Sequence, residues 1–362
     1  MIRNVLYRTD SLILKISSLN YNRKSCKNIY FSNNNGFFTK STNQHLSSTE
    51  VHCINVVKKF DYENFVATLF ISDEEIRRTA FALRAFNVEL AQVRDITRTD
   101  ELAQIRFQFW HDVIDEIYLI SSDNHVPDKE TLMKYKNFPL AFELFKVLSG
   151  TEKLSKHWIS RLIQIRRDPK YLGEYPFQTL DELEKYCEAS VVSIYYLLNE
   201  KSIQSLNEGQ KNAGYRIALD HVANHLGKAQ GLTNILRGII HNSKNRRCYI
   251  PNDILIKSKS SHEAFLQCQQ DNDSLREAIF LIASTAKGHL EHVQKLLDSN
   301  GNETPTIRKS DRLMFLPMMA IQAYLHDLQR VQFNVFDRRL YRRRGSLPLK
   351  MWWKCKIFNF RN

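Results

Sequence analysis

The stretch Ile217-Ala-Leu-Asp-His-Val-Ala-Asn-His-Leu-Gly-Lys-Ala-Gln-Gly-Leu-Thr-Asn-Ile-Leu-Arg-Gly-Ile-Ile240 decides the fold class. Apolar residues recur in it every three or four positions, from Leu219 to Ile239, and this period predicts a long helix with one face in the core. A second stripe at the same spacing is small and polar, and it includes Gly227 and Gly231. Each glycine costs about 1 kcal/mol relative to alanine in a helix interior. We therefore expect this stripe to face a neighbouring helix or a cavity.

Helical periodicity continues on both sides of this stretch, whereas convincing alternation with a period of two is scarce. The segment Ser72-Asp-Glu-Glu75 supplies a cap and acids for a first turn, and Pro169 and Pro176 lie between two of the patterns. These features predict an all-α, single-domain bundle of eight or more helices. The predicted helices span about 74–95, 100–120, 139–149, 153–167, 178–200, 209–240, 272–298 and 311–332.

The chain has 362 residues and a formal net charge of +13, and the excess positive charge lies at its two ends. Residues 1–49 carry seven bases and one acid, and residues 338–362 carry nine bases and no acid. The residues between them have a net charge of −2, so the body is nearly neutral. We therefore expect no nucleic-acid partner. No window approaches 18 consecutive apolar residues, so we expect no membrane-spanning helix.

The two charged ends differ in composition, and they divide the chain into three expected parts. Residues 1–50 are basic, rich in serine and poor in acids, which is typical of a mitochondrial presequence. The alternative is a basic tail that carries no targeting signal. Residues 51–337 form the helical domain. Residues 338–362 join basic residues to Trp352 and Trp353, which suits peripheral contact with an anionic membrane surface; a solvated tail is the alternative.

Cysteine and histidine spacings give no support for a metal or a disulfide framework. The six cysteines are scattered without CxxC or zinc spacing, which fits free thiols in a reducing compartment such as the mitochondrial matrix. The pairs His221/His225 and His289/His292 have helical spacing that can chelate a metal, but the sequence places no third ligand. We therefore favour a surface or packing role for them and expect no metal and no cofactor.

Four stretches of the sequence resemble signatures of the squalene/phytoene synthase family. Gly231-Leu-Thr-Asn-Ile-Leu-Arg237, followed after a short loop by Arg247-Cys-Tyr-Ile-Pro251, resembles the second signature of that family. Arg78-Thr-Ala-Phe-Ala-Leu-Arg-Ala-Phe86 resembles the start of its first signature, and Tyr186-Cys-Glu-Ala-Ser190 resembles its middle helix. The similarity runs from about 62 to 335. It implies an isoprenoid-synthase-like helical bundle around a central cavity.

The sequence departs from the family pattern at the positions where the enzymes of that family bind metal. The active members condense two prenyl diphosphates, and two Asp-rich helical motifs hold the Mg²⁺ ions for which carboxylate oxygens are needed. The first motif falls on Ala91-Gln-Val-Arg-Asp95 and the second on Gly238-Ile-Ile-His-Asn242, so Asp95 is the one carboxylate retained. The resemblance therefore implies no Mg²⁺ site and no catalytic residue. The degenerate positions are Ala91, Gln92 and Asp95 in the first motif and Gly238, His241 and Asn242 in the second.

Within the family, the chain resembles a branch of mitochondrial complex I assembly factors. The similarity lies in Phe86-Asn-Val-Glu-Leu-Ala-Gln-Val-Arg94, Gln108-Phe-Trp110, His225-Leu-Gly-Lys-Ala-Gln-Gly231 and Gln329-Arg-Val-Gln-Phe-Asn-Val-Phe336. It implies a non-enzymatic protein, peripheral to the matrix side of the inner membrane. Complex I subunits or other assembly factors are the partners that it implies.

Two other functions stay open for the same fold. One is an active or residual prenyl-diphosphate-binding transferase, with Glu89 or Glu101 as substitute metal ligands. The other is an isoprenoid or lipid carrier that uses the cavity. Four retained family positions could still bind an anionic head group, and without metal such binding should be weak and sensitive to salt. The alternative is that they maintain the fold, with Arg237 paired to Asp95. These four residues are Lys228, Arg237, Arg247 and Tyr249.

Overall fold

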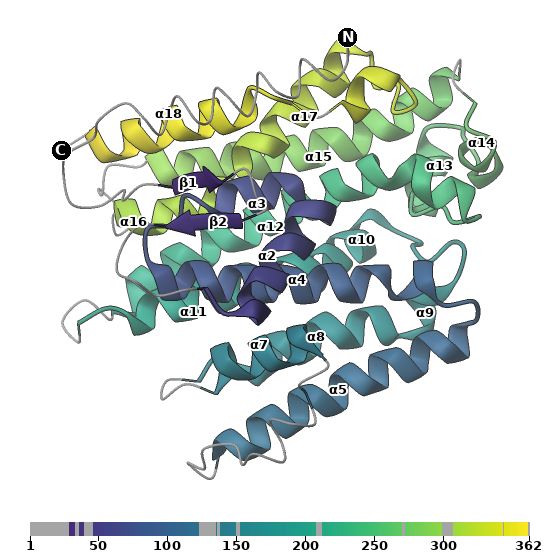
Figure 1. Cartoon of the computed structure of the whole chain (residues 1–362). Coiled ribbons are helices and arrows are strands. Elements are labelled where there is room, and N and C mark those ends of the chain that lie inside the picture. The colour runs from purple at the N-terminus through teal and green to yellow at the C-terminus, as the bar shows by residue number, and fades with distance from the viewer. Residues whose placement is uncertain are drawn as a thin grey trace.

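The computed structural model is a bundle of helices, as the periodicity predicts (Figure 1). In the part of the chain that it describes, one antiparallel hairpin is the exception, with Ile29 opposite Thr39 and Ser32 opposite Gly36. The rest of the expected presequence before residue 46 lies outside the described residues. The structure describes residues 29–32, 36–39, 46–122, 135, 138–149, 153–207, 212–269, 272–298, 307–342 and 344–360.

The elements follow one another along the chain as helices of very different lengths. They are β1 (Ile29–Ser32), β2 (Gly36–Thr39), α2 (Ser48–Phe60), α3 (Tyr62–Thr68), α4 (Glu74–Ile96), α5 (Asp100–Ser122), α7 (Pro139–Leu148), α8 (Lys156–Arg167), α9 (Pro169–Leu172), α10 (Leu180–Cys187), the π-turn η1 (Glu188–Val192), α11 (Ser193–Gln204), α12 (Ala213–Lys244), α13 (Asn252–Lys257), α14 (His262–Leu266), α15 (Asp273–Asp298), α16 (Lys309–Arg312), the 3₁₀ turn η3 (Leu313–Phe315), α17 (Met318–Arg330), the 3₁₀ turn η4 (Arg338–Tyr341) and α18 (Leu347–Phe360).

Side-chain caps begin several of these helices. The Asp73 carboxylate accepts a hydrogen bond from the Ile76 N–H at 2.9 Å at the start of α4, and the Asn212 amide oxygen accepts one from the Tyr215 N–H at 2.6 Å at the start of α12. Each cap satisfies a backbone donor that the first turn leaves without an intrahelical partner. The start expected from residues 72–75 is therefore confirmed to within one residue.

Two predicted helices are interrupted. The helix expected at 178–200 contains the π-turn η1, where the Ser193 hydroxyl donates to the Ala189 carbonyl at 2.9 Å. A π-turn inserts one residue into an otherwise continuous helix, which hydropathy alone does not reveal. The helix expected at 311–332 is broken before α17, because Pro317 has no N–H to continue the backbone ladder.

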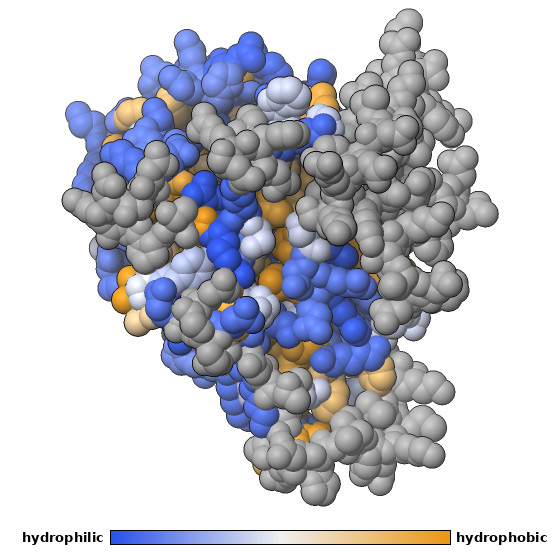
Figure 2. Space-filling model, turned by 90° about the vertical axis from the view of Figure 1, so that its left-hand side faces the viewer, coloured by the Kyte–Doolittle hydropathy of each residue, from blue (hydrophilic) through white to orange (hydrophobic). Residues whose placement is uncertain are grey.

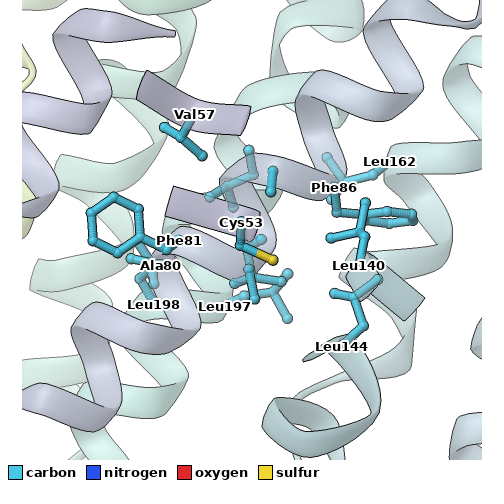
Figure 3. Close-up of a cluster of buried hydrophobic side chains, with 14 of the residues drawn as sticks. Cys53, Val57, Ala80, Phe81, Phe86, Leu140, Leu144, Leu162, Leu197 and Leu198 are labelled. Carbon is cyan, nitrogen blue, oxygen red and sulfur yellow. The ribbon is translucent and has the colours of Figure 1, made fainter. Parts of the chain in front are cut away.

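The buried side chains form two large clusters on the two sides of the bundle. The first joins α2, α4, α7, α8 and α11, and Figure 3 shows part of it, with Cys53, Phe86 and Leu144 each fully buried. The second joins α10, α12, α15 and α17, and α12 packs most extensively against α15. Met319 packs against both clusters, so they form one continuous interior.

Helix α18 packs on the body although it lies in the expected C-terminal tail. Leu347, Met351 and Cys355 are buried on its inner side, and the helix contacts α3, α16 and α17. The division of the chain into three parts stays a prediction.

The surface agrees with a protein that packs its apolar residues inside. Figure 2 shows one face on which hydrophobic residues are visible mainly in narrow strips between hydrophilic ones. Among the described residues, no helix combines the length and the apolar character that crossing a bilayer requires. The five described cysteines are all free thiols, which fits the expectation; Cys26 lies outside the described residues.

Candidate functional site

The residues at the two expected motif positions, 91–95 and 238–242, meet where α4 and α12 end. Asp95 lies in the last turn of α4, and its two carboxylate oxygens have different partners. One oxygen accepts a hydrogen bond from Arg247 Nη1 at 3.1 Å, and the other lies 3.0 Å from His241 Nε2 on α12. The one retained carboxylate is therefore occupied by a guanidinium and an imidazole.

Arg94 and Arg247 connect α4 to neighbouring segments through hydrogen bonds. Arg247 also donates through Nη2 to the Arg94 carbonyl at 2.9 Å. The Arg94 guanidinium in turn donates to the Tyr249 hydroxyl at 2.9 Å, to the Tyr171 carbonyl at 3.2 Å and to the Leu172 carbonyl. Arg94 lies at the position of the first expected motif, and here it holds α9 and the segment after α12 against α4.

These residues do not fit a Mg²⁺ cluster. Ala91, Gly238 and Asn242 supply no carboxylate, and Asp95 already faces the positive charge of Arg247. A hard dication needs several anionic oxygens and would be repelled by a guanidinium in this position. Nowhere in the described part of the chain do three histidine, cysteine or acidic side chains form a group that could hold a metal.

The proposed substitute ligands do not complete the set. Glu89 forms an ion pair with Arg106 of α5. Glu101 lies exposed in the first turn of α5, where a hydrogen bond from Thr99 holds the pKa of its carboxyl below its usual value. Both carboxylates are therefore engaged away from Asp95.

Arg237 does not pair with Asp95, so that expectation is wrong. Its guanidinium lies 2.9 Å from Glu63 of α3 and 5.8 Å from the centre of the Tyr324 ring. His241, one helical turn further along α12, and Arg247 use the carboxylate oxygens of Asp95 instead. Arg237 therefore ties α12 to α3 and α17.

The four residues expected to bind an anion are spread over three places. Arg247 and Tyr249 lie together beside Arg94, Arg237 lies beside Glu63, and Lys228 lies 3.4 Å from Glu184 of α10. Each of the three bases already has an acidic partner. Joint binding of one head group by these residues stays a prediction.

The two histidine pairs meet across the interface between α12 and α15. His225 Nδ1 lies 2.8 Å from His289 Nδ1, and the His225 ring stacks on His292 with centroids 4.8 Å apart. On the other side of His289, Nε2 lies 3.4 Å from Glu184. The preferred packing role fits this arrangement, and the contact between the two pairs could not be seen in either pair alone.

Only one proton fits between the Nδ1 atoms of His225 and His289, so both rings cannot be protonated at Nδ1 at the same time. Burial, followed by the neighbouring His289, His221, His292 and Lys228, lowers the pKa of His225 to about 4. The hydrogen bond from His289 and the charges of His289 and Lys228 hold the pKa of Glu184 below its usual value, although burial opposes them. The cluster is thus most stable with His225 neutral.

The glycine stripe of α12 faces a neighbouring helix. A Cβ atom on Gly227 would lie 2.5 Å from the Val192 Cγ2 atom, and one on Gly231 would lie 2.5 Å from the Cys187 Cβ atom. The end of α10 and the π-turn therefore approach α12 too closely for any side chain. Of the two expectations for the stripe, contact with a helix is confirmed.

A polar cluster in the interior escaped the sequence analysis. Arg84 of α4 is 3% exposed, and its guanidinium lies 5.7 Å from the centre of the Tyr195 ring. The buried Tyr195 hydroxyl donates to the Gln230 amide oxygen at 2.5 Å, and burial raises its pKa to about 12. The position of Arg84 within the apolar run 79–86 was the one signal in the sequence that could have indicated a buried polar cluster.

Side chains also leave little room near the C-terminal end of α12. The pocket beside Asn242, Arg247 and Tyr249 has a volume of about 10 Å³, which suffices for one water at most. The larger hollow of about 520 Å³ lies on α5, beside Asp112 and Leu119. The central cavity implied by the resemblance stays a prediction.

Comparison with known proteins agrees with this architecture. A family model described as squalene/phytoene synthase matches residues 57–346. The chain is 34% identical over 307 residues to the Bos taurus protein named NADH dehydrogenase (ubiquinone) complex I, assembly factor 6, which covers 84% of this chain and 81% of that protein. It is 33% identical over 312 residues to the Drosophila melanogaster homolog of that factor, and this alignment covers 85% of this chain and 84% of that protein.

Solved structures show the same fold at low sequence identity. A dehydrosqualene synthase with a ligand superposes with a TM-score of 0.62 at 15% identity, over 86% of this chain and 96% of that chain. The squalene synthase HpnC from Alicyclobacillus acidocaldarius gives a TM-score of 0.58 at 16% identity, and the superposition covers 79% of this chain and 95% of that chain. These likenesses confirm the all-α, synthase-like fold.

Proposed function

Because the chain belongs to the squalene/phytoene synthase family, we propose that it uses the fold of that family for assembly of mitochondrial respiratory complex I rather than for prenyl transfer. In this proposal it is a pseudoenzyme with two degenerate metal motifs. The observation that carries it is the position of Asp95, whose carboxylate is bound by Arg247 and His241 where a metal cluster would need free oxygens. The names of the two relatives above support the same function.

The residues argue against prenyl transfer in a specific way. Ionisation of a diphosphate needs a concentrated positive charge from metal ions, and those ions need carboxylates. Here the motif positions contribute one acid, and bases fill the space around it. The arrangement lowers the local negative charge instead of raising it, so it opposes metal binding.

We place the protein at the matrix side of the inner membrane. The basic, acid-poor segment 1–50 supports import into mitochondria. The outward side of α18 supports peripheral contact with an anionic bilayer, because Leu349 and Trp353 are exposed one turn apart and Lys350 lies beside them. Tryptophan and lysine are the residues that favour the membrane–water interface. Complex I subunits or other assembly factors are the proposed protein partners.

A rescue experiment tests the function. Cells that lack the gene product should contain less assembled complex I, and the wild-type chain should restore it. The Asp95→Ala variant should restore it equally, because the proposed function needs no metal ligand at this position. Failure of the variant to rescue, at normal protein level, would contradict a dismantled metal site.

An enzymatic assay tests the alternative directly. The purified chain with farnesyl or geranylgeranyl diphosphate and Mg²⁺ should release no pyrophosphate above the level of a heat-denatured sample. Release of pyrophosphate that depends on Arg247 would overturn the proposal. The carrier function has less support, because Val192, Cys187 and Tyr195 fill space along α12; a lipid that stays bound in native mass spectrometry would favour it.

A further inference from the structure

A second exposed aromatic group lies beside the basic run that precedes α18. Phe280 of α15 is 41% exposed, and its ring packs edge to face against Phe333, with centroids 5.1 Å apart. Tyr341 in η4 is 47% exposed, and its hydroxyl donates to the Val335 carbonyl at 2.5 Å. We call the contacting pair Phe280 and Phe333, together with Tyr341 eight residues further along the chain, the aromatic patch.

The backbone presents this patch on a rigid frame. After α17 ends, Gln332 and Phe333 adopt positive φ values of 53° and 59°, a conformation that side chains with a Cβ atom disfavour. The Phe333 N–H donates to the Leu328 carbonyl at 2.9 Å, which fixes the reversal of the chain. The buried Val335 then anchors the segment on the body. The Phe333 ring is therefore held against Phe280 by the fold and not by a flexible loop.

Several arginines lie in the same stretch of chain as Phe333 and Tyr341. Within this segment, Arg339 pairs with Asp337 and Arg344 pairs with Asp327. Arg330, Arg338 and Arg342 are exposed, and no acid of the described ranges lies within ion-pair distance of them. The segment that carries Phe333 and Tyr341 thus also carries three guanidinium groups that pair with no acid of the described ranges.

We propose that the aromatic patch and the outward side of α18 form one docking face for an anionic phospholipid bilayer. This inference rests on the proposed membrane contact and extends it from the tail to α15, α17 and η4. Figure 1 shows α17 and α18 along the same upper side of the bundle. Two weak anchors are needed for stable peripheral binding, because one apolar or basic element alone binds a membrane only marginally.

The composition favours a bilayer over an acidic protein or a nucleic acid. The exposed side chains Phe280, Tyr341, Leu349 and Trp353 include the ring types that gather at the membrane–water interface, and the bases stand beside them. An acidic protein surface would be recognised mainly by paired charges. A bilayer instead accepts rings and aliphatic side chains among the head groups.

Vesicle co-sedimentation of the full chain tests the proposal. The wild type should bind vesicles of phosphatidylcholine and cardiolipin more strongly than vesicles of phosphatidylcholine alone. Phe280→Ser and the double variant Arg338→Gln/Arg342→Gln should each reduce binding, the second by roughly tenfold at low salt. Ile256→Ser is the matched control, because Ile256 is 77% exposed elsewhere on the molecule and its loss should leave binding unchanged.

The outcomes separate this inference from the proposed function. If Leu349→Ser/Trp353→Ser loses binding but the patch variants retain it, the extended face is wrong and the contact through α18 stands. If the patch variants bind vesicles normally but lose complex I subunits in affinity purification, the patch is a protein surface and the inference is overturned. If the wild type binds no vesicles, both the membrane contact through α18 and the extended docking face are wrong. The rescue experiment still tests the role in assembly of complex I. A circular dichroism melt of each variant shows that it is folded.

Discussion

The middle of α12 and the C-terminal end of α12 are held to their neighbours in different ways. In the middle, Gly227 and Gly231 bring α12 into direct contact with Val192 and Cys187. At the end, Asp95 and the loop after α12 are held together by charges and hydrogen bonds. One helix thus combines a region held by steric fit with a region held by electrostatics.

The difference teaches which part of this fold tolerates change. Close packing leaves no room for an added methyl group, because the neighbouring backbone cannot move without disturbing the core. Exposed ion pairs contribute little, and their partners can be exchanged for other polar residues. Substitutions at the charged end of α12 should therefore disturb the fold less than substitutions in its packed middle.

The largest effect is expected from breaking the packed middle. Gly231→Val should destabilise the protein by about 3 kcal/mol, because its side chain overlaps Cys187. Urea unfolding measures the change. Gly288→Ala on α15 is the matched control: no atom lies within 4 Å of its added Cβ, so it should stabilise the helix by about 0.5–1 kcal/mol. Equal effects of the two variants would contradict steric fit as the basis of the middle region.

A smaller effect is expected from breaking the charged end. Arg247→Ala removes donors to Asp95 and to the Arg94 carbonyl, and it should cost about 1–2 kcal/mol in the same assay. Lys244→Ala, at an exposed position on the same end of α12, should change stability by less than about 0.5 kcal/mol. A loss for Arg247→Ala as large as that for Gly231→Val would remove the contrast between the two regions.

The histidine cluster gives the middle region a pH dependence. The folded pKa of His225 is about 4, below the ordinary value of 6.5, so the unfolded chain binds the proton more tightly. Stability from this group is fully present above about pH 6.5 and falls as the pH drops toward 4. The midpoint of urea denaturation at pH 8 and at pH 5 should show this loss.

A histidine variant separates this cluster from the other titrating groups. His225→Gln should reduce the difference in the midpoint between pH 8 and pH 5, whereas His52→Gln, at an exposed position of α2, should leave it unchanged. If both variants keep the full difference, the titration that weakens the protein lies elsewhere.

The smallest effect is expected from the retained carboxylate and from metal. Asp95→Asn should cost less than about 1 kcal/mol, because Asp95 is partly exposed and its pairs are solvated. Addition of Mg²⁺ or of EDTA should leave the Tm of the wild type unchanged. An increase of Tm with Mg²⁺ that disappears in Asp95→Asn would show that the charged end still binds metal.

Much of the fold could be predicted from periodicity. The spacing of apolar residues in 217–240 predicted a long helix, and the cost of Gly227 and Gly231 predicted a close neighbour, because both arguments need only local geometry. The family resemblance placed the two motif positions on α4 and α12. It could not show that Arg247 instead of Arg237 reaches Asp95, because that choice depends on the path of the loop after α12.

The sequence by itself determined the helical class and the family, because residue types and helical spacing are local properties. Only the tertiary structure decided the partners. It brought His225 to His289, Arg84 to Tyr195 and Phe280 to Phe333, which are far apart in the chain. These contacts depend on the packing of whole helices, and a hydrophobic period specifies which face of a helix is buried but not which helix covers it.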